Sequence, residues 1–154
     1  MSHDLRELEG YEMDEEEIES VLEEVGLGVL SMTHEGVPYG IPLAFGYGGT
    51  NRLYFLFVGH STQGRKVTYA EDDGPVSFLA YDVESEGDWR SVIVEGTLDR
   101  ITPDEWKEAR EALAANAYRP ELLSSFDEQE DPRVWALDIT KKTGRAMGDR
   151  HRTE

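Results

Sequence analysis

The sequence predicts a mainly β protein, in which antiparallel strands form a closed or partly closed barrel with a few peripheral helices. Three observations predict this fold class. Apolar residues are concentrated between Leu27 and Ile101. Strand-like segments follow one another with short turns between them, as antiparallel strands do. The helical patterns are few and do not alternate with the strands, which argues against a doubly wound sheet.

The first expected element is an amphipathic helix. Asp14 and Glu17 have the spacing of a capping box, in which each side chain accepts from the other residue's backbone N–H. Apolar residues follow at helical spacing before Gly26, namely Ile18, Val21, Leu22 and Val25. We therefore expect one buried helix face.

Six segments have the composition of strands: 27–33, 37–45, 53–58, 76–81, 89–101 and 134–140. Residues 34–36 and 47–51 are expected to be hairpin turns, residues 82–88 an acidic loop, and Gly96 a bulge. The segment 53–58 is apolar on both faces. Because a barrel interior covers only one face, this segment predicts a homodimer.

Two further helices are expected. One is short and lies within residues 62–71. The other begins at Thr102 as N-cap, has Pro103 at its first position and reaches Ala117. Its apolar stripe consists of Trp106, Ala109 and Leu113. Together, these elements predict a single domain at residues 13–147, between a mobile segment 1–12 and a loose tail 148–154.

The composition excludes several classes of function. The net charge of −18, from 33 acidic and 15 basic residues, disfavours nucleic acids and anionic membranes as partners. Acidic residues occur throughout the chain, which indicates a halophilic source. No cysteine is present, and the four histidines lack the spacing of metal ligands, so no metal is expected. The chain has no apolar run of membrane-spanning length and no signal-peptide core, which predicts a cytoplasmic protein.

Three segments could bind a ligand. Residues 59–66 combine a helix start, hydroxyl groups and adjacent Arg65 and Lys66, which is typical of an anion site; the alternative is a capped helix with solvated basic residues. Residues 39–45 contain a glycine and a proline, so backbone groups could bind a planar heterocycle with Ala44 leaving room; a bent edge strand is equally compatible.

The third segment, Trp89-Arg90-Ser91, could stack on a ring or bind a second anion, or it could be a surface arginine beside a half-buried tryptophan. No nucleophile, base and orienting group are recognisable by their spacing in the sequence. Any catalysis would therefore come from a cofactor, and a flavin fits because it carries out the electron chemistry itself.

Several short blocks together resemble the pyridoxamine 5′-phosphate oxidase-like FMN-binding family, nearest to its nitroimidazole-resistance-protein branch. The blocks are residues 28–32, 36–42, 53–55, 64–66, 75–78 and 90–96. The resemblance implies a six-stranded antiparallel split β-barrel that dimerises, with FMN in a groove between the subunits. It implies the phosphate near Ser61, Arg65 and Lys66, and the ring system along Pro42, Leu43, Ala44 and Phe45. The full candidate set of cofactor-binding residues adds His60, Gln63, Gly64, Arg90 and Ser91.

Authentic pyridoxamine 5′-phosphate oxidases end with an Arg-Leu-x-Pro type segment, and this sequence ends Gly-Asp-Arg-His-Arg-Thr-Glu. The resemblance therefore favours an FMN-dependent reductase of a small-molecule acceptor over vitamin B6 oxidation. Two alternatives stay open: a deazaflavin-dependent reductase of the same fold, and a non-catalytic flavin carrier or sensor.

Overall fold

The computed structural model describes residues 10–49, 51–56, 65–71, 74–115 and 134–148, apart from the side chains of 65–67. Its helices are α1 (Glu15–Glu24), α2 (Arg65–Ala70) and α3 (Trp106–Ala114), the last preceded by a 3₁₀ turn η2 (Pro103–Glu105). Its strands are β1 (Tyr11–Glu12), β2 (Leu27–His34), β3 (Val37–Ala44), β4 (Gly46–Tyr47), β5 (Arg52–Leu56), β6 (Val76–Ser85), β7 (Asp88–Arg100) and β8 (Val134–Met147).

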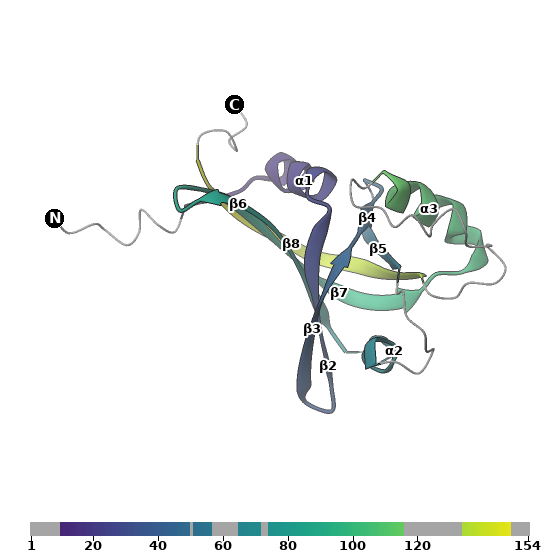
Figure 1. The fold of residues 1–154 in the computed structure, drawn as a ribbon. Coiled ribbons are helices and arrows are strands. Elements are labelled where there is room, and N and C mark those ends of the chain that lie inside the picture. The colour runs from purple at the N-terminus through teal and green to yellow at the C-terminus, as the bar shows by residue number, and fades with distance from the viewer. Residues whose placement is uncertain (1–9, 50, 57–64, 72–73, 116–133, 149–154) are drawn as a thin grey trace.

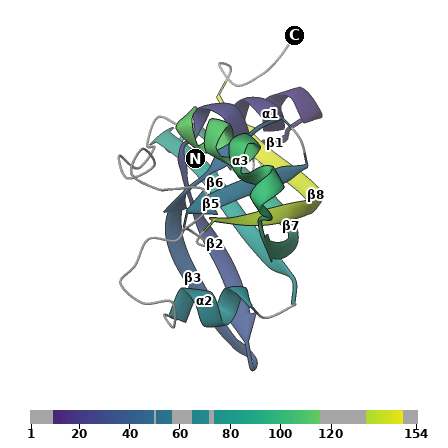
Figure 2. The ribbon, with the colours of Figure 1, turned by 90° about the vertical axis from the view of Figure 1, so that its right-hand side faces the viewer.

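All described strands belong to one antiparallel sheet with the order β3-β2-β6-β7-β8-β5-β4, and β1 pairs with β8. The sheet is strongly curled, with α1 and α3 at one end and α2 beside the β2–β3 hairpin (Figures 1 and 2). The six expected strands are all present, so the predicted split-barrel fold class is confirmed. The additional strands β1 and β4 are only two residues long.

The helix α1 begins as the sequence predicts. Asp14 accepts from the backbone N–H of Glu17 at 2.9 Å, and Glu17 accepts from the backbone N–H of Asp14 at 3.0 Å. These bonds satisfy two donors at the helix start that would otherwise lack partners. The buried apolar side chains of α1 are Ile18, Val21 and Leu22, which join the core inside the curled sheet.

The strand β5 is buried on both faces within one chain. Leu53 and Phe55 point into the main core, whereas Tyr54 and Leu56 belong to a second cluster with Trp106 of α3. The expectation that a second subunit must cover this strand is therefore wrong, because α3 covers it. The apolar stripe of α3 is confirmed: Trp106, Ala109, Ala112 and Leu113 are buried.

Two glycines allow close approaches of the backbone. The pairing of β7 with β8 shifts register between Glu95 and Gly96, which confirms the predicted bulge. At Gly46, a β-carbon would lie 2.6 Å from the backbone carbonyl carbon of Ala112, so α3 can rest directly on β4 only because position 46 lacks a side chain.

The chain contains more strand than the sequence predicts. The expected acidic loop 82–88 is wrong for residues 82–85, which continue β6, and for Asp88, which begins β7; Asp82, for example, pairs with Arg90. The last strand extends to Met147 instead of ending at Thr140. Tyr11 and Glu12, expected in the loose N-terminal segment, pair with Ala146 and Arg145. Pairing to a long neighbouring strand outweighs the low strand propensity of acidic residues.

The start of the third helix also differs from the expectation. Thr102 occupies the N-cap of the 3₁₀ turn without a side-chain capping bond, and α3 itself begins at Trp106. Residues 116–133, which include the expected end at Ala117, lie outside the described residues. Within the described part of the chain, no helix is both long and apolar enough to cross a membrane.

Candidate functional site

The strand β3 lies at one edge of the sheet and pairs with β2 along its whole length, from Val37 opposite His34 to Ala44 opposite Leu27. Gly40 and Pro42, which set this segment apart in the sequence, do not interrupt its pairing with β2. Proline lacks the N–H that a central strand would use, so it fits an edge strand whose second side carries no ladder. Among the described strands only β2 pairs with β3, which agrees with both readings of this segment, a heterocycle-binding strand and an edge strand.

The short helix α2 is anchored on the β2–β3 hairpin through aromatic contacts. The ring centroid of Tyr69 lies 4.9 Å from that of Tyr39 on β3 and 5.6 Å from that of His34 on β2. Tyr69 and Ala70 are both buried. These contacts fix the helix beside the edge strand (Figure 2). Pro42, which the resemblance placed along the flavin ring, follows Tyr39 by three residues on β3, and three residues span roughly 10 Å along a strand.

The sequence-predicted phosphate segment is described only in part. Arg65 and Lys66 are the first two residues of α2, so the position of their helix is known, and their side chains lie outside the described residues. The remaining members of the segment, His60, Ser61, Gln63 and Gly64, also lie outside them.

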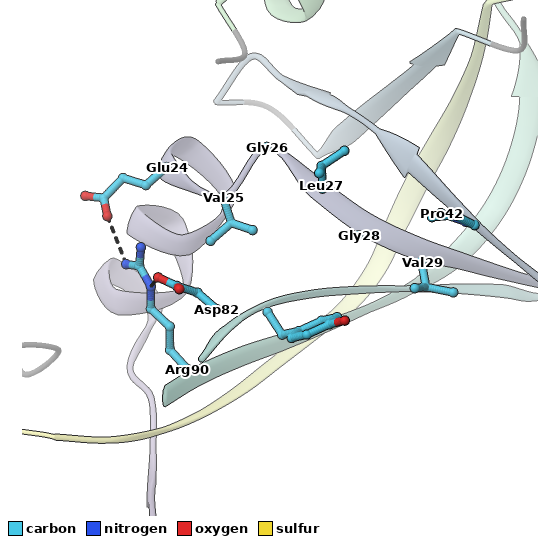
Figure 3. A pocket seen from close by; sticks show the side chains of 10 residues that line it. Glu24, Val25, Gly26, Leu27, Gly28, Val29, Pro42, Asp82 and Arg90 are labelled. Carbon is cyan, nitrogen blue, oxygen red and sulfur yellow. Dashed lines mark hydrogen bonds and ion pairs between the residues drawn. The ribbon is translucent and has the colours of Figure 1, made fainter. Parts of the chain in front are cut away.

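A pocket of about 440 Å³ lies between the start of β2, the edge strand β3 and the β6–β7 hairpin. Its volume falls within the range of small-molecule sites. Val25, Leu27, Val29 and Pro42 give it apolar lining, and Arg90 closes it at the end that carries Glu24 and Asp82 (Figure 3). The pocket therefore brings together Pro42 and Arg90, two residues that the sequence analysis singled out from separate segments.

Arg90 is held by two carboxylates. Its Nη1 donates to Glu24 of α1 at 2.9 Å, and its Nε donates to Asp82 of β6 at 3.3 Å. The side chain is only 12% exposed. Glu24 and Asp82 together outweigh its single positive charge, so the surroundings of Arg90 disfavour the second anion site that the sequence suggested.

The other predicted residues have different environments. Leu43 and Ala44 are partly exposed on β3, whereas Phe45 is 1% exposed and packs edge-on against Phe78 at a centroid distance of 4.9 Å. The side chain of Phe45 is thus a core group.

Ser91 follows Arg90 on β7, so its side chain points to the opposite face of the sheet. There it lines a separate pocket of about 280 Å³ with Thr143 and Arg145. The structure does not bring Ser91 and Pro42 into one pocket.

Sequence reasoning missed most of the lining of the larger pocket, including Glu24, Leu27, Tyr81 and Asp82. One signal was present in the sequence. Tyr81 continues the strand that begins at Val76, but on the face opposite to Phe78 and Ala80, and it is 52% exposed. Together with the exposed Val83 and Ile93 it forms an apolar patch on the outer face of the sheet, and such a patch is a sign of a binding surface.

A curled antiparallel sheet with one end covered by α1 and an open edge strand beside a pocket defines a split β-barrel protein. The family model described as pyridoxamine 5′-phosphate oxidase matches residues 14–146. The chain belongs to this family, which confirms the resemblance seen in the sequence. No curated protein matches the chain significantly.

Several solved structures share the fold. An FAD-binding protein from Mesorhizobium loti is 21% identical with a TM-score of 0.68, over 90% of this chain and 98% of that one. A candidate 5-nitroimidazole antibiotic resistance protein from Bacteroides thetaiotaomicron is 19% identical with a TM-score of 0.67, over 96% and 95%. The FAD-binding protein from Mycobacterium smegmatis is 20% identical with a TM-score of 0.66, over 88% and 97%.

Proposed function

We propose that this protein binds FMN and uses it to pass electrons to a small-molecule acceptor. One observation carries the proposal: α2, which begins with Arg65 and Lys66, is anchored against the hairpin that contains the edge strand β3. In a chain with a net charge of −18, two adjacent basic residues are a distinct place for a phosphate. The exposed edge of β3 offers a planar ring its backbone groups.

The similar structures support a flavin as the ligand, since two of them are named as FAD-binding proteins. When bound, a flavin would supply the electron transfer, which fits a chain without a recognisable nucleophile and base. The chain's own part is to hold the phosphate with Arg65 and Lys66 and to orient the ring along Pro42, Leu43 and Ala44. The side chain of Phe45 is buried in the core and its backbone N–H donates to the carbonyl oxygen of Gly26 at 3.3 Å, so Phe45 would support this surface from behind.

We further propose that the protein is a homodimer with the flavin at the subunit interface. The outer face of β6 and β7 carries exposed apolar side chains: Tyr81 is 52%, Val83 62% and Ile93 46% exposed. The register places Ile93 opposite Leu79, and the pairing of Gly28 with Ala80 brings Leu27 next to Tyr81. A second copy would pack on Leu79, Val83 and Ile93 of this apolar patch, with Leu27 and Tyr81 at its border beside the pocket.

The first test is the identity of the small molecule that copurifies with the full chain. Mass spectrometry and the absorption spectrum of the released molecule distinguish FMN, FAD and a deazaflavin. Finding FMN supports the proposal. Finding FAD or a deazaflavin would support flavin-type binding but would show that the cofactor is not FMN. A protein that binds none of the three after incubation with each would overturn it. Turnover separates the reductase from a flavin carrier: bound reduced FMN must be reoxidised by an acceptor faster than free FMN is.

A further inference from the structure

The pocket bounded by Leu27, Val29, Pro42, Tyr81 and the Arg90 cluster has a chemical character of its own. Its wall is apolar and includes the half-exposed ring of Tyr81. Gly26 and Gly28 line it with backbone only. Gly28 must stay a glycine, because a β-carbon there would overlap the ring of Phe78 on the core side of β2.

The polar end of the pocket carries a net negative charge. Arg90 contributes one positive charge, and its two ion-pair partners Glu24 and Asp82 contribute two negative charges. Two of the five N–H donors of the guanidinium are used by these carboxylates, so others can still donate to a ligand. An anionic ligand would meet the excess carboxylate charge, and the −18 charge of the whole chain acts in the same direction.

We propose that this pocket is the binding site for the small acceptor, and that it selects flat aromatic molecules that are neutral or cationic and rejects anionic ones. Calling the ligand an acceptor rests on the proposed function; the charge selectivity rests on the pocket alone. The pocket shares Pro42 with the strand proposed to hold the flavin ring, so a ligand in it would lie beside that ring. Glu24 and Asp82 set the preference for neutral or cationic ligands, because their two negative charges outweigh the one positive charge of Arg90.

Three probes of the same shape test the selectivity: 4-nitrobenzylamine, 4-nitrobenzyl alcohol and 4-nitrobenzoate. Each is titrated into the ¹⁵N-labelled full chain without flavin, and the amide signals of Gly26, Gly28 and Val29 report binding at this place. We expect the amine to bind about tenfold more tightly than the benzoate at low salt, with the alcohol between them. Equal affinities or tightest binding of the benzoate would overturn the proposal.

Matched variants separate the pocket from the general charge of the protein. Glu24→Gln and Asp82→Asn should each reduce the preference for the amine over the benzoate at least about threefold, because each frees part of the charge of Arg90. Glu84→Gln makes the same charge change on an exposed residue of β6 outside the pocket and should leave the preference unchanged. An equal effect of all three variants would show that only overall charge matters, which overturns the proposal.

A last arm distinguishes this inference from the proposed function. The titration is repeated with the chain saturated with FMN. Retained binding of the amine supports a separate acceptor site. Displacement of the amine by FMN would mean that the pocket holds the flavin, which overturns the acceptor assignment and leaves flavin binding intact. A chain that binds the probes with the predicted selectivity but no flavin would instead overturn the proposed function.

Discussion

The backbone carbonyl oxygen of Asp138 on β8 occupies the space that a β-carbon on Gly96 would need. The two residues meet where the β7–β8 pairing shifts register. Gly96→Ala should therefore lower the free energy of unfolding by about 2–4 kcal/mol, since backbone must move to make room. Urea denaturation measures the change. Gly87→Ala is the control, because nothing lies within 4 Å of a β-carbon there; a loss as large as that at Gly96 would contradict this account.

The proposed phosphate site predicts a difference between two flavins. Arg65→Ala and Lys66→Ala should each weaken FMN binding about ten- to a hundredfold, because a charge-assisted hydrogen bond is lost. Riboflavin has the same ring system and no phosphate, so its affinity should change much less. Fluorescence titration measures both.

Lys107→Ala is the matched control for the phosphate site, since Lys107 is exposed on α3 and carries the same charge. It should bind FMN normally. If Lys107→Ala weakens FMN as much, or if riboflavin and FMN are affected alike, the phosphate does not lie at Arg65 and Lys66.

The proposed dimer predicts that a charge within the apolar patch dissociates it. Val83→Asp should shift the protein from dimer to monomer at micromolar concentration, as measured by size-exclusion chromatography with light scattering. Val37→Asp makes the same change at another exposed valine, which lies beside the β2–β3 turn and is 50% exposed. It should stay dimeric. A wild-type protein that elutes as a 17.4 kDa monomer with FMN bound would refute the shared-groove arrangement.

Tyr47 predicts a specific alkaline effect. Its phenol donates to the Glu19 carboxylate at 2.5 Å, and burial together with this bond raises the pKa of Tyr47 above its usual value near 10. The folded state therefore holds this proton more tightly than the unfolded state, so its stabilisation is complete below pH ~10 and is lost as the pH rises further.

Tyr47→Phe removes both the bond and the titration. We expect it to cost about 1 kcal/mol at pH 7, and we expect the stability gap to the wild type to narrow as the pH rises above about 10. Denaturant unfolding at several pH values measures the gap. A gap that stays constant over this range would exclude a role of the Tyr47 proton.

The acidic surface predicts salt-dependent stability. With 33 acidic and 15 basic residues, the folded chain repels itself at low ionic strength, and salt screens this repulsion. The Tm should therefore rise from low to molar potassium chloride, which calorimetry can follow. A Tm that falls steadily over that range would contradict the halophilic interpretation.

The sequence by itself determined most of the strands and the capping box of α1, because these depend on residues close together in the chain. It marked the bulge through Gly96, although the bulge forms against β8, because a glycine inside a strand pattern is a local signal. The tertiary structure decided that α3 covers the second face of β5, since apolar periodicity shows that a face is buried and not what covers it. The tertiary structure also decided the charge environment of Arg90. Its partners lie 66 and 8 residues away, so only the fold shows that two carboxylates outweigh its charge.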